Sequence, residues 1–287
     1  MGYKNTFFRW HACVLAGVAL FVTLIASGVF AWAAGEGWQT LEQGVEKASF
    51  VFPSFSNSTG APSAPASLAA LRLDPYKVDF DLLMASEQGK ARTLLDWSGE
   101  YGLIAAINAS MYLPDKITST GYMRRNEHAN NSRIVSSFGA FFVAGPDNES
   151  LPPAAVLDRK QDDWESLISH YKIVVQNFRM MTPEGVPLWG ETTRMFSIAA
   201  VAQDNKGNIL FLHTAQPMTV NEFVNGVMSL DLNIDRLMYV EGGHQAAMLV
   251  NAGGFSQTWT GRLSFFIQDG TLVSLPNVLG VKRRKPE

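Results

Sequence analysis

The sequence predicts an α+β fold, with one mixed, largely antiparallel sheet and flanking helices in a single domain, preceded by an N-terminal membrane helix. Strand-like segments outnumber helix-like segments, and many neighbouring strands are joined by tight turns. No internal repeat is present in the sequence. With 287 residues, 47% of them hydrophobic, the chain can build one sizeable core or a domain with appendages.

The first 35 residues predict a signal anchor or a signal peptide. Lys4 and Arg9 precede an uncharged, apolar run over 12–35, which is long enough to cross a membrane. The length favours an anchor through residues 12–35, whereas Ala31-Trp32-Ala33 suits a cleavage site. Both alternatives place the rest of the chain outside the cytoplasmic membrane, since the positive end stays inside.

Residues 36–70 are expected to form a flexible linker. The segment 53–70 is rich in Pro, Ser, Ala and Gly and lacks charge and periodicity. A short amphipathic helix over 35–51 is expected before it. The folded domain then covers residues 71–287.

The first half of the domain predicts strands separated by short helical segments. Apolar and acidic residues alternate over 77–84, which is typical of a half-buried strand. The apolar run 103–108 predicts a buried strand that delivers Asn108 to a sheet edge. Further strands are expected over 138–144, ending at Gly145-Pro146, and over 171–177. Short helices are expected over 91–99, where a turn is the alternative, and over 162–170.

The second half predicts a hairpin, a helix and more strands. Segments 196–203 and 208–214 flank the turn Asp204-Asn205-Lys206-Gly207. Thr219 and Glu222 have the spacing of a capping box, which predicts a helix over 219–230. Strands follow over 236–240 and 247–251, and a terminal hairpin is expected over 265–269 and 271–274.

Composition excludes several classes of protein. A net charge of -3 gives no basic surface for a nucleic-acid partner. The one cysteine, Cys13, allows neither an internal disulfide in the domain nor a cysteine metal cluster, and this favours a bacterial cell envelope protein. The histidines lack ligand spacing, so we expect no metal and no cofactor. The motifs of serine esterases, zinc peptidases and P-loop NTPases are missing.

The loop Glu241-Gly242-Gly243-His244 is the leading candidate site. It follows a predicted strand, and glycines let backbone N–H groups approach a substrate closely. Glu241 suits an acid, a base or an orienting group, and partial burial would raise its pKa. His244 suits a proton shuttle or a phosphate donor; the alternative is a residue that fills space.

Other candidates depend on their positions at strand ends. Arg194 opens a strand and suits phosphate capture; the alternative is a structural ion pair. Asn108 suits a hydrogen bond to a sugar or phosphate; the alternative is an amide that caps backbone. Thr120, Gln176 and Asn177 are weaker candidates for substrate binding.

Four ordered segments resemble the phosphodiester glycosidase family. They are AAINASMY (105–112), FGAFFVAGP (138–146), the hairpin that begins at Arg194, and YVEGGHQAAMLV (239–250). The resemblance covers roughly 72–275 and implies the family's fold, a carbohydrate or sugar-phosphate substrate, and site roles for Asn108, Arg194 and Glu241. The sequence departs from the family pattern at Glu241, where Asp is common, and at His244 and Ala246-Ala247, where small and hydroxyl residues are common.

Two functional hypotheses follow. In the first, the domain is an extracytoplasmic hydrolase that splits sugar-phosphate diesters or related glycosidic bonds in envelope glycans. Asn108 and Arg194 hold the diester, Glu241 transfers the proton, and the amides of Gly242 and Gly243 steady negative charge. In the second, the domain is a non-catalytic glycan-binding or assembly protein of the same fold. The first hypothesis requires the amide, the guanidinium and the acid to meet.

Overall fold

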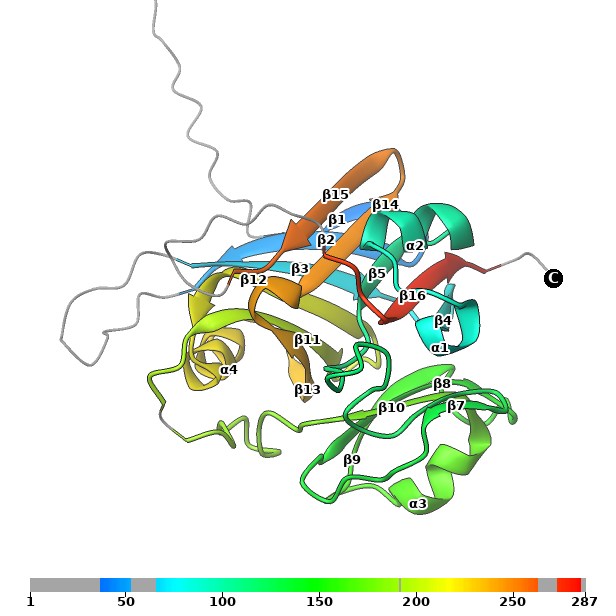
Figure 1. Cartoon of the computed structure of the whole chain (residues 1–287). Coiled ribbons are helices and arrows are strands. Elements are labelled where there is room, and N and C mark those ends of the chain that lie inside the picture. The colour runs from blue at the N-terminus through cyan, green and yellow to red at the C-terminus, as the bar shows by residue number, and fades with distance from the viewer. Residues whose placement is uncertain (1–36, 53–65, 191, 263–272, 285–287) are drawn as a thin grey trace, which may run out of the picture. The chain divides into compact units, whose positions relative to one another are not determined.

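Three antiparallel sheets form the framework of the computed structural model, which describes residues 37–52, 66–190, 192–262 and 273–284 (Figure 1). Sheet I has six strands in the order β1 (Gln39–Glu42), β2 (Val45–Val51), β3 (Ser67–Leu73), β12 (Ile209–Met218), β11 (Phe196–Asp204) and β13 (Ile234–Gly242). Sheet II has the order β7 (His128–Asn131), β6 (Met123–Arg125), β10 (Tyr171–Asn177), β8 (Ala140–Pro146) and β9 (Ala154–Asp158). Sheet III has the order β15 (Phe255–Thr260), β14 (Ala247–Ala252), β5 (Ala105–Asn108), β16 (Asn277–Arg283) and β4 (Val78–Met84).

The three sheets share one apolar core. Leu71 from sheet I, Phe142 from sheet II and Ile107 from sheet III belong to the same buried cluster. Each of these side chains is 0% exposed. Burying a large apolar side chain contributes roughly 2 kcal/mol, so this shared cluster is the main force that holds the sheets together.

Helices cover the opposite faces of the sheets. The helix α4 (Val220–Met228) packs on sheet I, and α2 (Leu94–Tyr101) packs on sheet III (Figure 1). The short α3 (Trp164–Leu167), which runs into a 3₁₀ turn at Ile168–His170, packs on sheet II. A further short helix, α1 (Ala85–Gln88), follows β4. The sheets are therefore buried on both faces, which explains their long apolar runs.

Local sequence signals account for several elements. Thr219 and Glu222 form both hydrogen bonds of the predicted capping box at the start of α4. The hairpin of β11 and β12 turns where the carboxylate of Asp204 accepts from the backbone N–H groups of Lys206 and Asn208. Gly207 has φ +83°, a conformation that favours glycine. The strand β10 has the predicted bounds.

The prediction for residues 36–70 is wrong where the structure describes them. Strands β1 and β2 occupy the segment expected to hold an amphipathic helix, and β3 is a central strand of sheet I. The side chains of 68–71 alternate between the shared core and the α4 side, so both faces of β3 are buried. A strand buried on both faces lacks a polar alternation, and Ala and Ser made this segment resemble a linker.

Other predictions need correction or are not covered. The sheet is not single and mixed: every strand pairing in the described residues is antiparallel, across three sheets. Strand β8 continues through Gly145 and Pro146 instead of ending before them. The expected turn at Asp269-Gly270 lies outside the described residues, as does the apolar run 12–35. Among the helices that are described, none has the length and apolar character needed to cross a membrane.

Candidate active site

A β-bulge near the end of β13 sets the direction of the Glu241 side chain. Glu241 lies opposite Ala199 and Tyr239 lies opposite Ala200, so Val240 is an extra residue between the two pairs. Without the bulge, Glu241 would share the face of Tyr239, which packs on the α4 side of sheet I. With the bulge, Glu241 shares the face of Ala199, which belongs to the core common to the three sheets.

The Glu241 carboxyl is nearly desolvated. The residue is 6% exposed, and its Oε1 accepts one hydrogen bond, from the backbone N–H of Gly242 at 2.9 Å. Burial raises the pKa of Glu241 to about 7, and the Gly242 hydrogen bond opposes this rise only in part. A carboxyl with this pKa holds and releases a proton close to neutral pH, which suits a general acid or base.

The hydroxyl of Tyr112, from a distant segment of the chain, lies close enough to this carboxyl to feel its charge. The Tyr112 hydroxyl accepts a hydrogen bond from Nε2 of Gln245. The pKa of Tyr112 is raised, first by burial and then by the charge of Glu241, while the Gln245 hydrogen bond lowers it. The hydroxyl proton of Tyr112 stays free to donate to another acceptor. Tyr112 and Gln245 lie within the family-like segments 105–112 and 239–250, but no local pattern in the sequence predicts a role for either side chain.

The loop after Glu241 is anchored from two sides. Nε2 of His213 lies 3.1 Å from the carbonyl oxygen of Ala246, and Oδ1 of Asn108 accepts from the backbone N–H of Ala247 at 2.7 Å. Both anchoring residues are 1% exposed. Burial lowers the pKa of His213 to about 4, so the ring is neutral and donates through Nε2. The role of His213 was not predictable, because nothing local in the sequence links β12 to this loop.

The two glycines of the loop are required by close contacts and by backbone conformation. A Cβ at Gly242 would lie 2.3 Å from Oη of Tyr239 and 2.7 Å from the ring of Phe196. Gly243 begins a 3₁₀ turn (Gly243–Gln245) with φ +71°. The N–H of Gly242 is already engaged with Glu241, so it is not free to steady a second negative charge.

The structure brings part of the predicted site together. Glu241, Gly242, Gly243 and His244 form one corner, and Asn108 is tied to it through Ala247. His244 is partly exposed, and its buried Nδ1 has no partner among the described residues. The amide oxygen of Asn108 accepts a hydrogen bond from the backbone, which corresponds to the capping alternative.

Arg194 has no hydrogen bond or ion pair with this corner in the described residues. Its side chain is exposed and makes neither an ion pair nor a hydrogen bond within the described part of the chain. The pKa of Glu241 is governed by burial and by Gly242, with no contribution from Arg194. The structure therefore does not show the expected meeting of guanidinium and acid.

The three weaker candidates bond mainly to backbone. The amide of Gln176 is buried, and it bonds the backbone of Tyr122, Val135 and Phe138. The Asn177 amide bonds the backbone of Phe178 and Val240 and is also buried. Thr120 is partly exposed, and its hydroxyl donates to Met111 at 3.4 Å. Gln176 and Asn177 thus shape the fold beside the site and do not face a ligand.

No metal site is present in the described residues. Among them, no group of three or more His, Cys, Asp or Glu side chains is placed to hold a metal ion.

Comparison with known proteins identifies the family. The family model for phosphodiester glycosidases (NAGPA) matches residues 101–282, which include every strand from β5 to β15 and the Glu241 corner. The chain belongs to the phosphodiester glycosidase family. No curated protein matches this sequence.

Two solved structures share the fold. One is the catalytic domain of zebrafish N-acetylglucosamine-1-phosphodiester alpha-N-acetylglucosaminidase, auto-inhibited by its pro-peptide, with TM-score 0.60, 11% identity and 86% of each chain covered. The other is a hypothetical protein from Synechocystis, with TM-score 0.59 and 11% identity, covering 86% of this chain and 63% of that one. At this identity the likeness establishes the fold and not the substrate.

Proposed function

We propose that the protein is a hydrolase of sugar-phosphate diesters, or of related glycosidic bonds in envelope glycans, with Glu241 as its general acid. One observation carries the proposal: a carboxyl with a pKa of about 7 lies at a strand end within a phosphodiester glycosidase fold. Buried carboxyls with such raised pKa values are concentrated at catalytic sites.

The proton of Glu241 has a defined position in this proposal. Oε1 accepts from Gly242, and Oε2 has no hydrogen-bond partner in the described residues, so the proton lies on Oε2. Oε2 gives this proton to the leaving oxygen as the bond from the anomeric carbon to that oxygen breaks. Water adds to the anomeric carbon, and its surplus proton returns to Glu241 or to solvent. Tyr112 and His244 are the nearby groups that can donate to the substrate.

Location outside the cytoplasm is part of the proposal. Its support is the sequence pattern of residues 1–35, with positive charges before an apolar run. Envelope glycans joined through phosphodiesters are accessible from that side of the membrane, so the location and the proposed substrate agree.

The test is a turnover screen of the full chain. Glycosyl phosphodiesters and plain aryl glycosides are offered to the wild type, to Glu241→Gln, and to Glu149→Gln as a control for the same change at an exposed position. We expect turnover of at least one glycosyl phosphodiester, unaffected by Glu149→Gln and lost in Glu241→Gln, with and without chelator. Full turnover by Glu241→Gln would remove Glu241 from the mechanism.

A second candidate function is glycan binding without catalysis. It is favoured by the lack of an ion pair between Arg194 and Glu241 in the described residues and by the hydrogen bond that the Gly242 N–H makes to Glu241. Retention of the full chain on an envelope glycan, with no product released over the whole panel, would select this alternative.

A further inference from the structure

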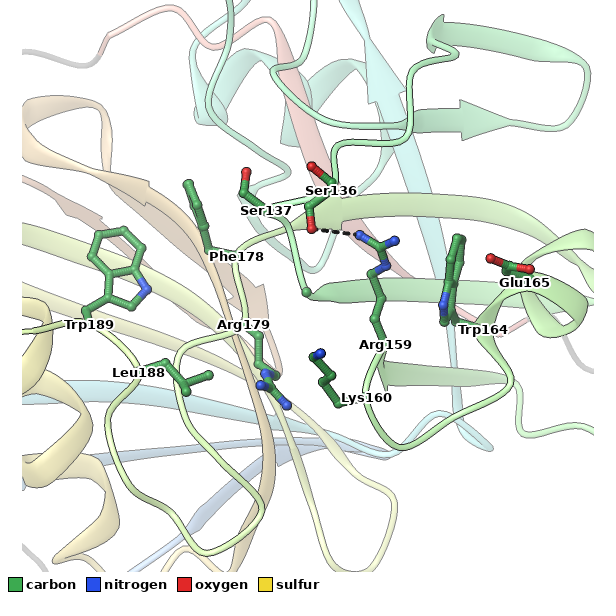
Figure 2. A pocket seen from close by; sticks show the side chains of 11 residues that line it. Ser136, Ser137, Arg159, Lys160, Trp164, Glu165, Phe178, Arg179, Leu188 and Trp189 are labelled. Atoms are coloured by element: carbon green, nitrogen blue, oxygen red, sulfur yellow. Dashed lines mark hydrogen bonds between the residues drawn. The ribbon is translucent and has the colours of Figure 1, made fainter.

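A cavity of about 620 Å³ lies away from Glu241, between sheet II and the segment after β10. Its volume is within the range of small-molecule sites, about 300–1,000 Å³. Figure 2 shows Lys160 and Arg179 between Leu188 and Trp189 on one side and Arg159 and Trp164 on the other. Three cations and several aromatic rings thus line one space.

Two of the three cations are fixed before any ligand arrives. Nη1 of Arg159 donates to three carbonyl oxygens in the segment 135–138, at 3.0 to 3.1 Å, and its guanidinium lies 4.5 Å from the ring centroid of Trp164. Nη1 of Arg179 donates to both carboxylate oxygens of Asp158, at 2.9 and 3.0 Å. Fixed guanidinium groups lose little conformational freedom when they bind an anion.

The carboxylate of Asp158 organises this wall of the cavity. It is 3% exposed, and besides Arg179 it accepts from the backbone N–H of Lys160 and from Nε2 of Gln161. Burial works against the charged form, but the hydrogen bonds from Arg179, Lys160 and Gln161 outweigh it and hold the pKa of Asp158 below its usual value. Asp158 therefore stays ionised and keeps Arg179 in place.

Lys160 is the cation left without a partner. Its side chain is exposed, lines the cavity, and makes no ion pair or hydrogen bond in the described residues. Asp158 balances Arg179, and Glu165 at the rim is the only acid among the lining residues. Arg159, Lys160 and Glu165 together leave an excess of positive charge, which favours an anionic ligand.

The remaining lining suits a sugar ring. Trp189 and Phe178 provide apolar faces, with ring centroids 5.1 Å apart, and Trp164 is stacked on Phe141 at 5.2 Å. Ser136 and Ser137 are exposed and add hydroxyl groups. Aromatic faces beside hydroxyl groups and cations offer both the stacking and the polar contacts that a charged sugar uses.

The cavity is connected to the Glu241 corner through packed rings. The ring centroids of Trp189 and Tyr239 are 5.3 Å apart, and the hydroxyl of Tyr239 lies against Gly242, the residue after Glu241. The backbone N–H of Tyr239 also donates to the carbonyl of Phe178 at 3.0 Å. Tyr239 thus contacts both Trp189 at the cavity and Gly242 at the corner.

We propose that this cavity is a second binding site, which takes a sugar unit bearing a phosphate or carboxylate group. Binding of an anionic sugar at this cavity does not depend on turnover at Glu241.

The test is calorimetric titration of the full chain with glucose 1-phosphate, glucuronate, glucose and inorganic phosphate. We expect glucose 1-phosphate or glucuronate to bind at least fivefold more tightly than glucose and phosphate; the tighter of the two identifies the anion. Lys160→Glu weakens that binding about tenfold. Lys172→Glu, an equal charge change at an exposed position of β10 outside the cavity, leaves it unchanged.

The controls separate this proposal from the proposed function. Glu241→Gln binds the same ligand as the wild type does, whether or not it retains turnover. Equal affinities of the Lys160→Glu and Lys172→Glu variants would overturn the cavity as the site. Equal affinities for glucose 1-phosphate, glucuronate and glucose would overturn its assignment to an anionic sugar.

Discussion

Asp158 and Glu241 are both buried carboxyl groups near strand ends, yet the fold shifts their pKa values in opposite directions. Asp158 is 3% exposed and Glu241 is 6% exposed, so the exposed fractions of the two residues are similar, although Glu241 lies deeper in the protein. Asp158 accepts from Arg179, Lys160 and Gln161, which lowers its pKa. Among the described residues Glu241 accepts only from Gly242, and burial raises its pKa to about 7. Deeper burial and fewer donors together decide that Glu241 is the carboxyl that keeps a proton.

Because their pKa values differ, the two carboxyl groups have different roles. Asp158 is a permanent anion that holds a cation and a turn in place. Glu241 is a group that exchanges a proton near neutral pH, as a general acid must. Neutralising each carboxyl with the same isosteric change therefore separates a positioning role from a chemical one.

The largest expected effect is on turnover. Glu241→Gln lowers kcat/KM on a glycosyl phosphodiester by about 10²–10³-fold, the usual contribution of a general acid. Asp158→Asn lowers it less than tenfold on the same small substrate, because Asp158 does not touch the reacting atoms. Steady-state rates of the two variants, measured side by side, check this. Comparable losses of kcat/KM in both variants would contradict the assignment of different roles to the two carboxyl groups.

The second effect is on the stability of Glu241→Gln. The folded-state pKa lies above the ordinary 4.5, so ionisation of Glu241 costs stability. The wild type is as stable as the variant below pH 4.5. Its free energy of unfolding falls below that of the variant as the pH rises from 4.5 to about 7, and the difference is level at about 3 kcal/mol above that. Urea unfolding at pH 4.5, 6 and 8 measures this. A constant difference over that range would contradict the raised pKa.

The third effect is on the stability of Asp158→Asn, and its pH dependence is opposite to that of Glu241→Gln. Asp158→Asn destabilises the protein by about 2 kcal/mol at pH 7, because Arg179 loses its ion pair while most of its side chain stays buried. The folded-state pKa of Asp158 lies below 3.8, so this stabilisation is present above pH 3.8 and is lost as the pH falls through the folded value. Unfolding of both proteins between pH 3 and 7 measures it. A stability difference between the wild type and Asp158→Asn that grows as the pH falls would contradict this prediction.

The smallest effect concerns a neighbour of Glu241. Tyr112→Phe removes a hydroxyl that Gln245 holds in place and whose proton is free to donate. We expect a loss of about three- to tenfold in kcat/KM, equal to one hydrogen bond of about 1 kcal/mol. Tyr101→Phe, at a partly buried tyrosine bonded to Gln88, is the matched control. An unchanged kcat/KM for Tyr112→Phe would contradict a hydrogen bond between this hydroxyl and the substrate.

Local signals in the sequence predicted much of the fold. The capping box of α4, the turn at Asp204 and the apolar run of β10 each depend on a few neighbouring residues. Strand β3 was missed because both its faces are buried, so it lacks the alternation that indicates a strand. Sheet III was not predictable, since β16 pairs with β4 and β5 from the other end of the chain.

The candidate site was predicted only in part, for the same reason. Glu241 and its glycines are adjacent in sequence and were found by their pattern. The direction of Glu241 depends on a bulge, and its loop is anchored by His213 from another strand; both depend on strand register. The second cavity was missed because Lys160 and Trp189 come from separate loops that no local pattern connects.

The most direct test of the account is the pH dependence of kcat/KM for a glycosyl phosphodiester, measured from pH 5 to 9. A general acid with a pKa of about 7 predicts a rate that is highest below pH 7 and falls about tenfold for each pH unit above it. A rate that stays level from pH 6 to 9 would contradict the account, because Glu241 would then not be the proton donor.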